Sequence, residues 1–325
     1  MSPFAFETTV DDVAAALDSQ IRGRNVIITG TSPGSLACEA AKAIAGRHPG
    51  LLVLTARKLS LLEETKAAIL LQSPDVKIKL LEFDLSSQES VRNAATSLTN
   101  EENKFDVLIN SAGIMASPYA QTSEGIESQF GINHIGPFLF TNLLIPVLDD
   151  GATIVNVTSR GYQMGPIQWD DLNFEHTEYN KWQAYAQSKA ANILFSASLA
   201  RKLQHKAITS FSVHPGSIFT NLGRHLTQED YDMLSGIPMQ YKNPQQGAAN
   251  MVIAAFDPSI RGGPFLRVQD TLPRLTELLA HNGGHIDDDC QVKPIPEAFA
   301  YAIGIDNEDR LWELSEKLVK QKFSY

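Results

Sequence analysis

The chain has 325 residues, 43% hydrophobic and 20% charged, and this balance excludes a disordered or low-complexity protein. Its net charge of -10, without any run of Lys and Arg, argues against a nucleic-acid partner, because acidic surfaces repel phosphate backbones. Its two cysteines cannot make a disulfide framework and indicate a reducing compartment. We expect a cytoplasmic protein without a transmembrane segment, because no apolar run approaches roughly 18 residues and the N-terminus is unlike a signal peptide.

Apolar runs alternate with helical stretches from residue 25 onward. Residues 1–24 are predicted to be an N-terminal extension with a short helix over 11–17, capped by Asp11 or Asp12. Short strands of Val, Ile and Leu between helices are typical of a parallel sheet covered on both faces. We therefore predict an α/β fold, a Rossmann-like doubly wound sheet in one domain over 25–325. The expected strands are 26–29, 51–55, 77–82, 107–109, 153–157 and 209–213, and the expected helices are 35–47, 58–71, 87–98, 122–148 and 182–203.

The part of the chain after residue 213 is less regular and is rich in Pro and Gly. It is expected to cover the carboxyl ends of the strands, where open α/β sheets bind ligands. Residues 160–182 and 217–243 are the expected substrate-covering regions. The apolar spacing after residue 306 predicts a C-terminal helix over 307–322.

The first turn, from Gly30 to Gly34, joins the first strand to a helix. Such a turn presents backbone N–H groups to a phosphate, although a plain loop with two glycines explains the same residues. The turn also matches GxSxG, the nucleophile elbow of hydrolases. Pro33 follows Ser32, however, and has no N–H for an oxyanion hole, which disfavours a hydrolase.

Five further motifs follow in chain order. They are Asn110-Ser111-Ala112-Gly113 after the fourth strand, Asn133 in a helical stretch, Ser159 at the end of the fifth strand, Tyr185-x-x-x-Lys189 in a helix, and His214-Pro215-Gly216 after the sixth strand. Together with the first turn, this order resembles the short-chain dehydrogenase/reductase family over roughly residues 24–256. The segments INHIGPFLFTNLL, AYAQSKAANILFSASLARKL and HPGSIFTNLGRHL are similar to its retinol-dehydrogenase-like and WW-domain-oxidoreductase-like members, especially fungal ones.

The resemblance implies redox chemistry at four residues. Tyr185 would give a proton to a carbonyl oxygen as hydride arrives from nicotinamide, and Lys189 would also hold the ribose hydroxyls. These two residues share a helix face, and an ammonium beside a phenol is expected to lower the phenol pKa from about 10. Ser159 would stabilise charge on the same oxygen. Asn133 would hold a water for proton resupply, or else serve as a buried amide at a helix kink.

The end of the second strand predicts the cofactor. NAD-selective folds place an acid there, whereas this chain has Arg57 and Lys58, whose charges suit the 2′-phosphate of NADP(H). Leu36 replaces the family's third turn glycine and is expected to weaken cofactor binding, with Ser35 offering a compensating hydrogen bond. The expected cofactor-binding residues are Gly30, Thr31, Ser32, Gly34, Ser35, Leu36, Arg57, Lys58, Asp84, Leu85, Asn110, Ala112, Gly113, Tyr185, Lys189, Pro215, Gly216, Ile218 and Thr220.

The 25 residues between Ser159 and Tyr185 form a long insert rich in aromatic side chains. They favour a hydrophobic small-molecule substrate, with a pocket at Met115, Tyr162, Met164 and Phe219. We expect carbonyl and alcohol interconversion, and the resemblance suggests secondary metabolism and a homodimer. Two alternatives stay open: a catalytically silent NADP(H)-binding protein, and a non-redox isomerase, dehydratase or cyclase on the same scaffold.

Polar residues near the end of the chain raise the question of a metal. His281, His285 and the run Asp287–Asp289 before Cys290 fit no zinc spacing. The prediction is therefore a solvated loop around a late strand, without a metal.

Overall fold

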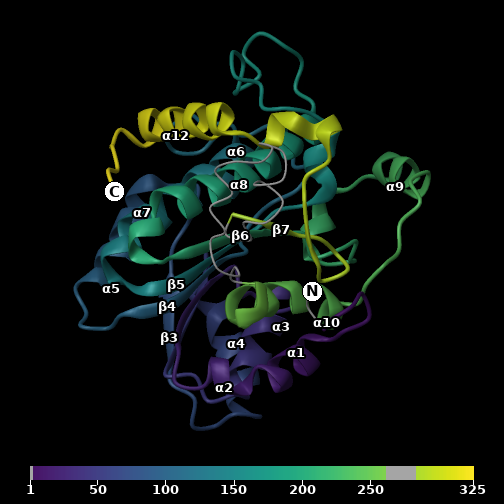
Figure 1. The fold of residues 1–325 in the computed structure, drawn as a ribbon. Coiled ribbons are helices and arrows are strands. Elements are labelled where there is room, and N and C mark those ends of the chain that lie inside the picture. Colours follow the sequence, from purple (N-terminus) through teal and green to yellow (C-terminus); the bar gives the residue numbers. More distant parts are fainter. Residues whose placement is uncertain (1–2, 261–282) are drawn as a thin grey trace, which may run out of the picture.

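The computed structural model describes residues 3–260 and 283–325 (Figure 1). Its described strands form one sheet in the order β3-β2-β1-β4-β5-β6-β7-β8, parallel except for the last pair. The order reverses between β1 and β4, the point at which open α/β sheets bind ligands. The predicted fold and all six predicted strands are confirmed. The strands are β1 Asn25–Thr29, β2 Leu51–Ala56, β3 Ile78–Glu82, β4 Phe105–Asn110, β5 Leu148–Val157, β6 Thr209–Val213, β7 His285–Ile286 and β8 Val292–Lys293.

Helices cover both faces of the sheet (Figure 1). Alternate side chains of a strand point to opposite faces, so Val26 and Ile28 join one core and Ile27 joins the other. The first core is completed by α1 (Val10–Ala16), α3 (Leu36–Ala45), α4 (Leu59–Leu70) and α10 (Pro244–Phe256). The second is completed by α5 (Gln88–Thr99), α7 (Gly136–Leu144), α8 (Lys181–Lys202) and α12 (Ile305–Val319).

The N-terminal helix α1 begins one residue earlier than predicted. Its cap is Thr9, whose hydroxyl accepts a hydrogen bond from the backbone N of Asp12, while the Asp12 carboxylate accepts one from the backbone N of Thr9. Capping by Asp11 or Asp12 is therefore wrong, because the reciprocal capping box satisfies two backbone donors at once. Val10 and Val13 are fully buried in the first core.

The helix predicted over 122–148 is divided in the structure. It comprises α6 (Ser128–Phe130), a π-helical turn at Gly131–Ile135, α7 and a short 3-10 turn at Ile145–Val147. By length and composition, Ser128–Val147 is apolar enough to cross a membrane, but 83% of the apolar window is buried inside the fold. Such burial is typical of a helix in the core of a folded domain.

After β6 the chain leaves the body and returns with α10, and residues 217–243 are called the cover segment below. It carries the short helix α9 (Gln228–Ser235), which projects from the body in Figure 1. Asp230 of α9 is buried and accepts hydrogen bonds from the Lys181 ammonium and, at 2.9 Å, from the Trp182 indole N–H. The cover segment is thereby attached to the first turn of α8.

Candidate active site

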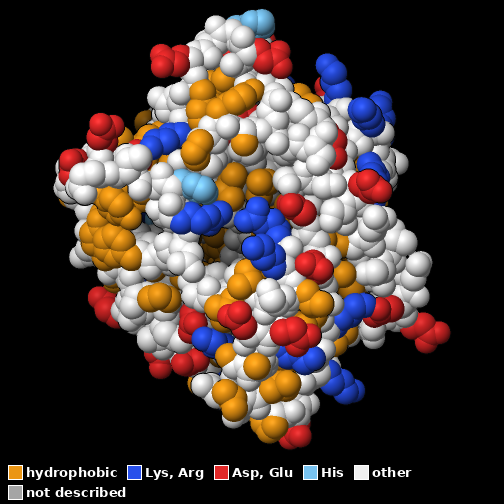
Figure 2. Space-filling view, turned by 180° about the vertical axis from the view of Figure 1, so that it is seen from behind, with side chains coloured by type: hydrophobic (Ala, Val, Ile, Leu, Met, Phe, Trp, Pro, Cys, Tyr) orange, Lys and Arg blue, Asp and Glu red, His pale blue; other side chains and the backbone are white. Residues whose placement is uncertain are grey.

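A cavity of about 980 Å³ lies at the carboxyl ends of the central strands, beneath the cover segment. Its walls come from the residues that follow β1, β2, β4, β5 and β6. Figure 2 shows a hollow on this face of the molecule, with Lys and Arg side chains beside it and hydrophobic side chains around it. The volume is in the range of cofactor and small-molecule sites, about 300–1,000 Å³.

The end of β5 is held against α8 by hydrogen bonds. Thr158 Oγ1 donates to the carbonyl of Lys189 at 2.7 Å, and the Lys189 Nζ donates to the carbonyl of Val157 at 3.1 Å. These bonds join the strand that ends before Ser159 to the helix that carries Tyr185. As a result Ser159, Tyr185 and Lys189 all line the cavity.

The turn after Ser159 passes very close to the catalytic candidate Tyr185. A Cβ at Gly161 would lie 2.6 Å from the tyrosine ring, so glycine is needed for this approach. The Lys189 Nζ lies 5.6 Å from the centroid of the Tyr185 ring. The hydroxyl, the phenol and the ammonium therefore converge in one part of the cavity.

Burial dominates the electrostatics of these groups. It raises the pKa of Tyr185 to about 12, and the hydrogen bond with Ser159 acts in the opposite direction. Burial also lowers the pKa of Lys189 to about 8. The expectation that the ammonium brings the phenol pKa below its ordinary value is wrong for this structure, because burial disfavours the charged phenolate. Tyr185 is thus a protonated phenol at neutral pH, which suits a proton donor.

Asn133 connects the loop after β4 to α8 and does not line the cavity. Its Oδ1 accepts from the backbone N of Ile114 at 2.8 Å, and its Nδ2 donates to the Ile114 carbonyl and the Ser188 hydroxyl, each at 2.9 Å. It lies in the π-helical turn. A Cβ at Gly113 would lie 2.9 Å from Asn133 Oδ1 and 3.7 Å from Lys189 Nζ, so the amide lies near the ammonium.

The first turn needs glycine at its start. Gly30 has φ +81°, and a Cβ there would lie 2.7 Å from the Cα of Ala112. Ser35 is the N-cap of α3, where its hydroxyl accepts from the backbone N of Cys38 and donates to the carbonyl of Gly30 at 2.8 Å. The hydroxyl proton that was expected to bind phosphate is therefore bonded within the turn.

Leu36 is accommodated by a glycine on a different helix. A Cβ at Gly247 of α10 would lie 3.3 Å from Leu36 Cδ2 and 2.1 Å from Ile218 Cδ1. Gly247 therefore leaves room for both side chains, which line the same wall of the cavity. The Leu36 side chain therefore fits between α3 and α10. The expected obstruction of the first turn does not arise.

Several predicted cofactor residues support the cavity from behind its wall. Asp84 Oδ1 accepts from the backbone N of Ser86 at 2.9 Å, and Asn110 Nδ2 donates to Thr141 and Asn156. The predicted cofactor residues that do not line the cavity are Thr31, Gly34, Lys58, Asp84 and Asn110, and those that do are Gly30, Ser32, Ser35, Leu36, Arg57, Leu85, Ala112, Gly113, Tyr185, Lys189, Pro215, Gly216, Ile218 and Thr220.

Tyr162 is not a substrate-pocket residue, and that prediction is wrong. Its side chain is 2% exposed and contacts the rings of His285 and Phe299 edge-on. Its carbonyl accepts from the Tyr301 hydroxyl at 2.8 Å. The 3-10 turn that follows Ser159 directs this ring into the core, whereas Met115, Met164 and Phe219 line the cavity as predicted.

The change Tyr162→Ala is expected to destabilise the fold by about 3 kcal/mol, because it leaves a cavity among aromatic rings. Substrate KM should change little in the protein that remains folded. Urea denaturation gives the free energy of unfolding, with Met164→Ala as the matched control, since Met164 is 41% exposed. A variant of full stability with a changed substrate preference would return Tyr162 to the pocket.

The residues that sequence reasoning missed are mostly on the cover segment. Arg224, Tyr231, Ile237 and Tyr241 line the cavity, as does Arg160 after β5. A signal was available in the capping box Thr-x-x-Asp over 227–230, which predicts the start of an exposed helix in a region we expected to be irregular.

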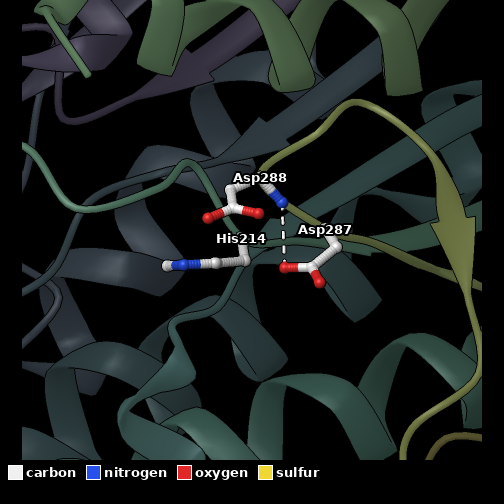
Figure 3. A group of neighbouring side chains, drawn as sticks. All are labelled: His214, Asp287 and Asp288. Carbon is white, nitrogen blue, oxygen red and sulfur yellow. Dashed lines mark hydrogen bonds between the residues drawn. The ribbon is translucent and has the colours of Figure 1, made fainter. Parts of the chain in front are cut away.

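The late acidic run packs beside the cavity, so the prediction of a solvated loop is wrong. Asp287, Asp288 and His214 bring their polar atoms within 4.8 Å of one another (Figure 3). The Arg160 guanidinium donates to both carboxylates at 3.1–3.3 Å. These ion pairs favour a structural role of the carboxylates, which follow β7. His281 lies outside the described residues.

Comparison with known proteins now places the chain. The family model for short chain dehydrogenase matches residues 24–231. The chain belongs to the short-chain dehydrogenase family. It is 34% identical over 319 residues to Retinol dehydrogenase 14 of Homo sapiens, covering 92% of this chain and 87% of the relative. It is 33% identical to Short-chain dehydrogenase/reductase prx1 of Penicillium rubens, covering 90% and 84%.

Solved structures agree with this family assignment. An uncharacterised protein of Mycobacterium paratuberculosis is 30% identical, with a TM-score of 0.69 over 96% of this chain and 98% of the other. A short chain dehydrogenase of Burkholderia cenocepacia, solved in complex with NADP, is 24% identical, with a TM-score of 0.59 over 73% and 92%. At that identity the second likeness concerns the fold. The short-chain dehydrogenase family consists of oxidoreductases that bind a nicotinamide cofactor and a small-molecule substrate.

Proposed function

We propose that this short-chain dehydrogenase uses NADP(H) to interconvert a carbonyl group and an alcohol on a lipophilic small molecule. The observation that carries the proposal is the convergence of Ser159, Tyr185 and Lys189 in one cavity, beside the glycine-rich first turn. The first turn supports a cofactor diphosphate, because the backbone N–H groups at such a junction of strand, turn and helix bind phosphate. Gly30 allows this turn to pack against Ala112.

The catalytic residues divide the work around one substrate oxygen. The cofactor, when bound, supplies hydride to the carbonyl carbon. Tyr185 holds its proton up to a pKa of about 12 and donates it to the oxygen, while the Ser159 hydroxyl stabilises the charge that develops there. Lys189, with a pKa of about 8, is mostly protonated at neutral pH and returns a proton toward Tyr185. Asn133 is a positioning residue: its hydrogen bonds to Ile114 and Ser188 hold the loop after β4 against α8, the helix that carries Lys189.

The preference for NADP(H) is proposed from Arg57, which follows β2 and lines the cavity. Its planar guanidinium can make paired hydrogen bonds to a 2′-phosphate. We expect Arg57→Ala to weaken NADPH binding about tenfold or more and to leave NADH binding within twofold. Nicotinamide fluorescence titration measures both dissociation constants, and equal losses for the two nucleotides would contradict the assignment. Arg22→Ala, which removes an exposed charge on the N-terminal side of β1, is the matched control.

A lipophilic substrate is proposed from the composition of the cavity wall and the likeness to retinol dehydrogenases. Met115, Met164, Phe219 and Tyr241 present apolar surface, and the Phe219 and Tyr241 rings stack at 4.9 Å. We expect NADPH oxidation with decanal or retinal and far less with acetaldehyde, measured as kcat/KM by nicotinamide absorbance. Equal kcat/KM values for decanal and acetaldehyde would contradict the substrate class.

The fungal relative supports a metabolic reductase, and a place in secondary metabolism is part of the proposal. A cytoplasmic location is proposed because the two cysteines indicate a reducing compartment, and a homodimer is proposed from the resemblance to the family. Among the alternatives, a silent NADP(H)-binding protein is disfavoured because Ser159, Tyr185 and Lys189 are assembled. A non-redox enzyme would use the same phenol, and the mass of the product separates it from a reductase.

A further inference from the structure

Two guanidinium groups from distant parts of the chain line one cavity. Arg57 follows β2, and Arg224 lies in the 3-10 turn Asn221–His225 of the cover segment. Both side chains are exposed. Within residues 3–260 and 283–325, no carboxylate forms an ion pair with either of them. Within the described part of the chain, therefore, no ion pair neutralises the charges of these two guanidinium groups.

These two cations are close enough for their charges to interact. Partial desolvation of Arg224, and after it the charge of Arg57, lowers the pKa of the Arg224 guanidinium. Burial and then the charges of Arg224 and Arg57 lower the pKa of His225 as well. Like charges at this range cost free energy, which an anion between them would offset. Lys, Arg and His side chains gather beside the hollow in Figure 2.

The 3-10 turn places Arg224 at the cofactor end of the cavity. Thr220 caps the turn by accepting from the backbone N of Leu222 at 3.2 Å, and Arg224 Nη1 donates to the carbonyl of Asn221 at 3.0 Å. A Cβ at Gly34 would lie 3.4 Å from Asn221 Nδ2. The turn of the cover segment is therefore adjacent to the glycine-rich first turn.

We infer that Arg224 and Arg57 together form the subsite for the 2′-phosphate of NADP(H), so that this phosphate joins the cover segment to the sheet. The inference rests on the proposed function for the nucleotide and adds to it a second cation and a consequence. A doubly wound sheet binds the ribose 2′ position of a dinucleotide at the end of its second strand. An anion bound between Arg57 and Arg224 is therefore the 2′-phosphate. A dianion bound by two planar forks is held by charge-assisted hydrogen bonds from both sides.

The consequence is a coupling between the cofactor and the cover over the substrate. NADPH stabilises the position in which Arg224 reaches the phosphate, whereas NADH makes no such contact with the cover segment. Because α9 is attached to α8 through Asp230, the turn with Arg224 has both ends fixed once the phosphate is bound. Substrate then meets a cavity whose cover is already positioned.

The test uses adenosine 2′,5′-bisphosphate and adenosine 5′-monophosphate, which differ by the 2′-phosphate. Calorimetric titration gives their dissociation constants for wild type, Arg57→Ala, Arg224→Ala and the control Arg22→Ala. We expect Arg224→Ala to weaken bisphosphate binding about tenfold and monophosphate binding less than twofold. If Arg57→Ala weakens the bisphosphate while Arg224→Ala matches Arg22→Ala, the inference is overturned and the proposed cofactor stands. If wild type binds both probes equally, the NADP(H) proposal fails and this inference with it.

A second readout follows the cover segment itself. Phe219 and Tyr241 are 69% and 50% exposed and offer chymotrypsin cleavage sites. The bisphosphate should slow cleavage between residues 217 and 243 in wild type several-fold, and the monophosphate should not. Arg224→Ala should abolish the protection, and protection that is retained in this variant would overturn the coupling.

Discussion

Replacing Tyr185 by Phe is expected to lower kcat for carbonyl reduction about a thousandfold, because the proton donor is removed. The ring, and with it the close approach of Gly161, is preserved. NADPH affinity should stay within about threefold, since the phosphate contacts proposed above do not involve the phenol oxygen. Single-turnover measurements with decanal separate the chemical step from cofactor binding.

The control for this change is Tyr119→Phe, which removes a hydroxyl from an exposed ring that does not line the cavity. It should leave kcat within about twofold. A Tyr185→Phe variant with normal kcat would show that another group gives the proton, and the account of the site would be wrong. A variant that loses NADPH binding as well would point to a structural effect of the hydroxyl.

Lys189→Met is expected to have opposite effects on activity and stability. Turnover should fall about a hundredfold, since the buried ammonium is the proposed source of protons for Tyr185. The free energy of unfolding at pH 7 should rise, by up to about 3 kcal/mol, because burial of the ammonium lowers its pKa to about 8 and the charged form is disfavoured in the fold. The bond to the Val157 carbonyl is lost in exchange and reduces the gain.

The difference in free energy of unfolding between wild type and Lys189→Met depends on pH, and its direction follows from the pKa of Lys189. The unfolded chain holds the Lys189 proton up to the ordinary pKa of 10.5, and the folded chain releases it near 8. Between these values the unfolded state binds more protons, so wild-type stability should rise with pH relative to Lys189→Met. Below pH 8 the difference is constant and favours the variant. Urea denaturation at pH 7 and pH 9.5 measures it, and a wild type that is more stable than the variant at both values would contradict the buried-charge account.

The sequence predicted the sheet well because its signals are local. Runs such as Val26-Ile27-Ile28 are apolar on both faces, as a buried parallel strand requires, and each is bounded by a turn. The motifs after β4, β5 and β6 then meet at one edge by topology alone. Tyr185, Lys189 and Ser159 could therefore be brought together without coordinates.

Features that depend on contacts between distant segments were missed. Tyr162 was assigned to the pocket by composition, but whether an aromatic ring faces the cavity or the core depends on how the insert folds against Phe299 and His285. The accommodation of Leu36 needs Gly247, which lies 211 positions later in the chain. The pKa of Tyr185 was predicted in the wrong direction, because spacing indicates a nearby ammonium and burial depends on the whole fold.

The central claim is hydride transfer from NADPH to a carbonyl, with the proton supplied by Tyr185. The most direct measurement uses NADPH carrying two deuterium atoms at the reactive carbon of the nicotinamide, with decanal as substrate and mass spectrometry of the product. The account predicts decanol that carries the deuterium from wild type, and about a thousandfold slower formation of this labelled decanol by Tyr185→Phe. Unlabelled decanol would contradict hydride transfer from NADPH. A product with the mass of the starting aldehyde would contradict the proposed reductase and favour the non-redox alternative.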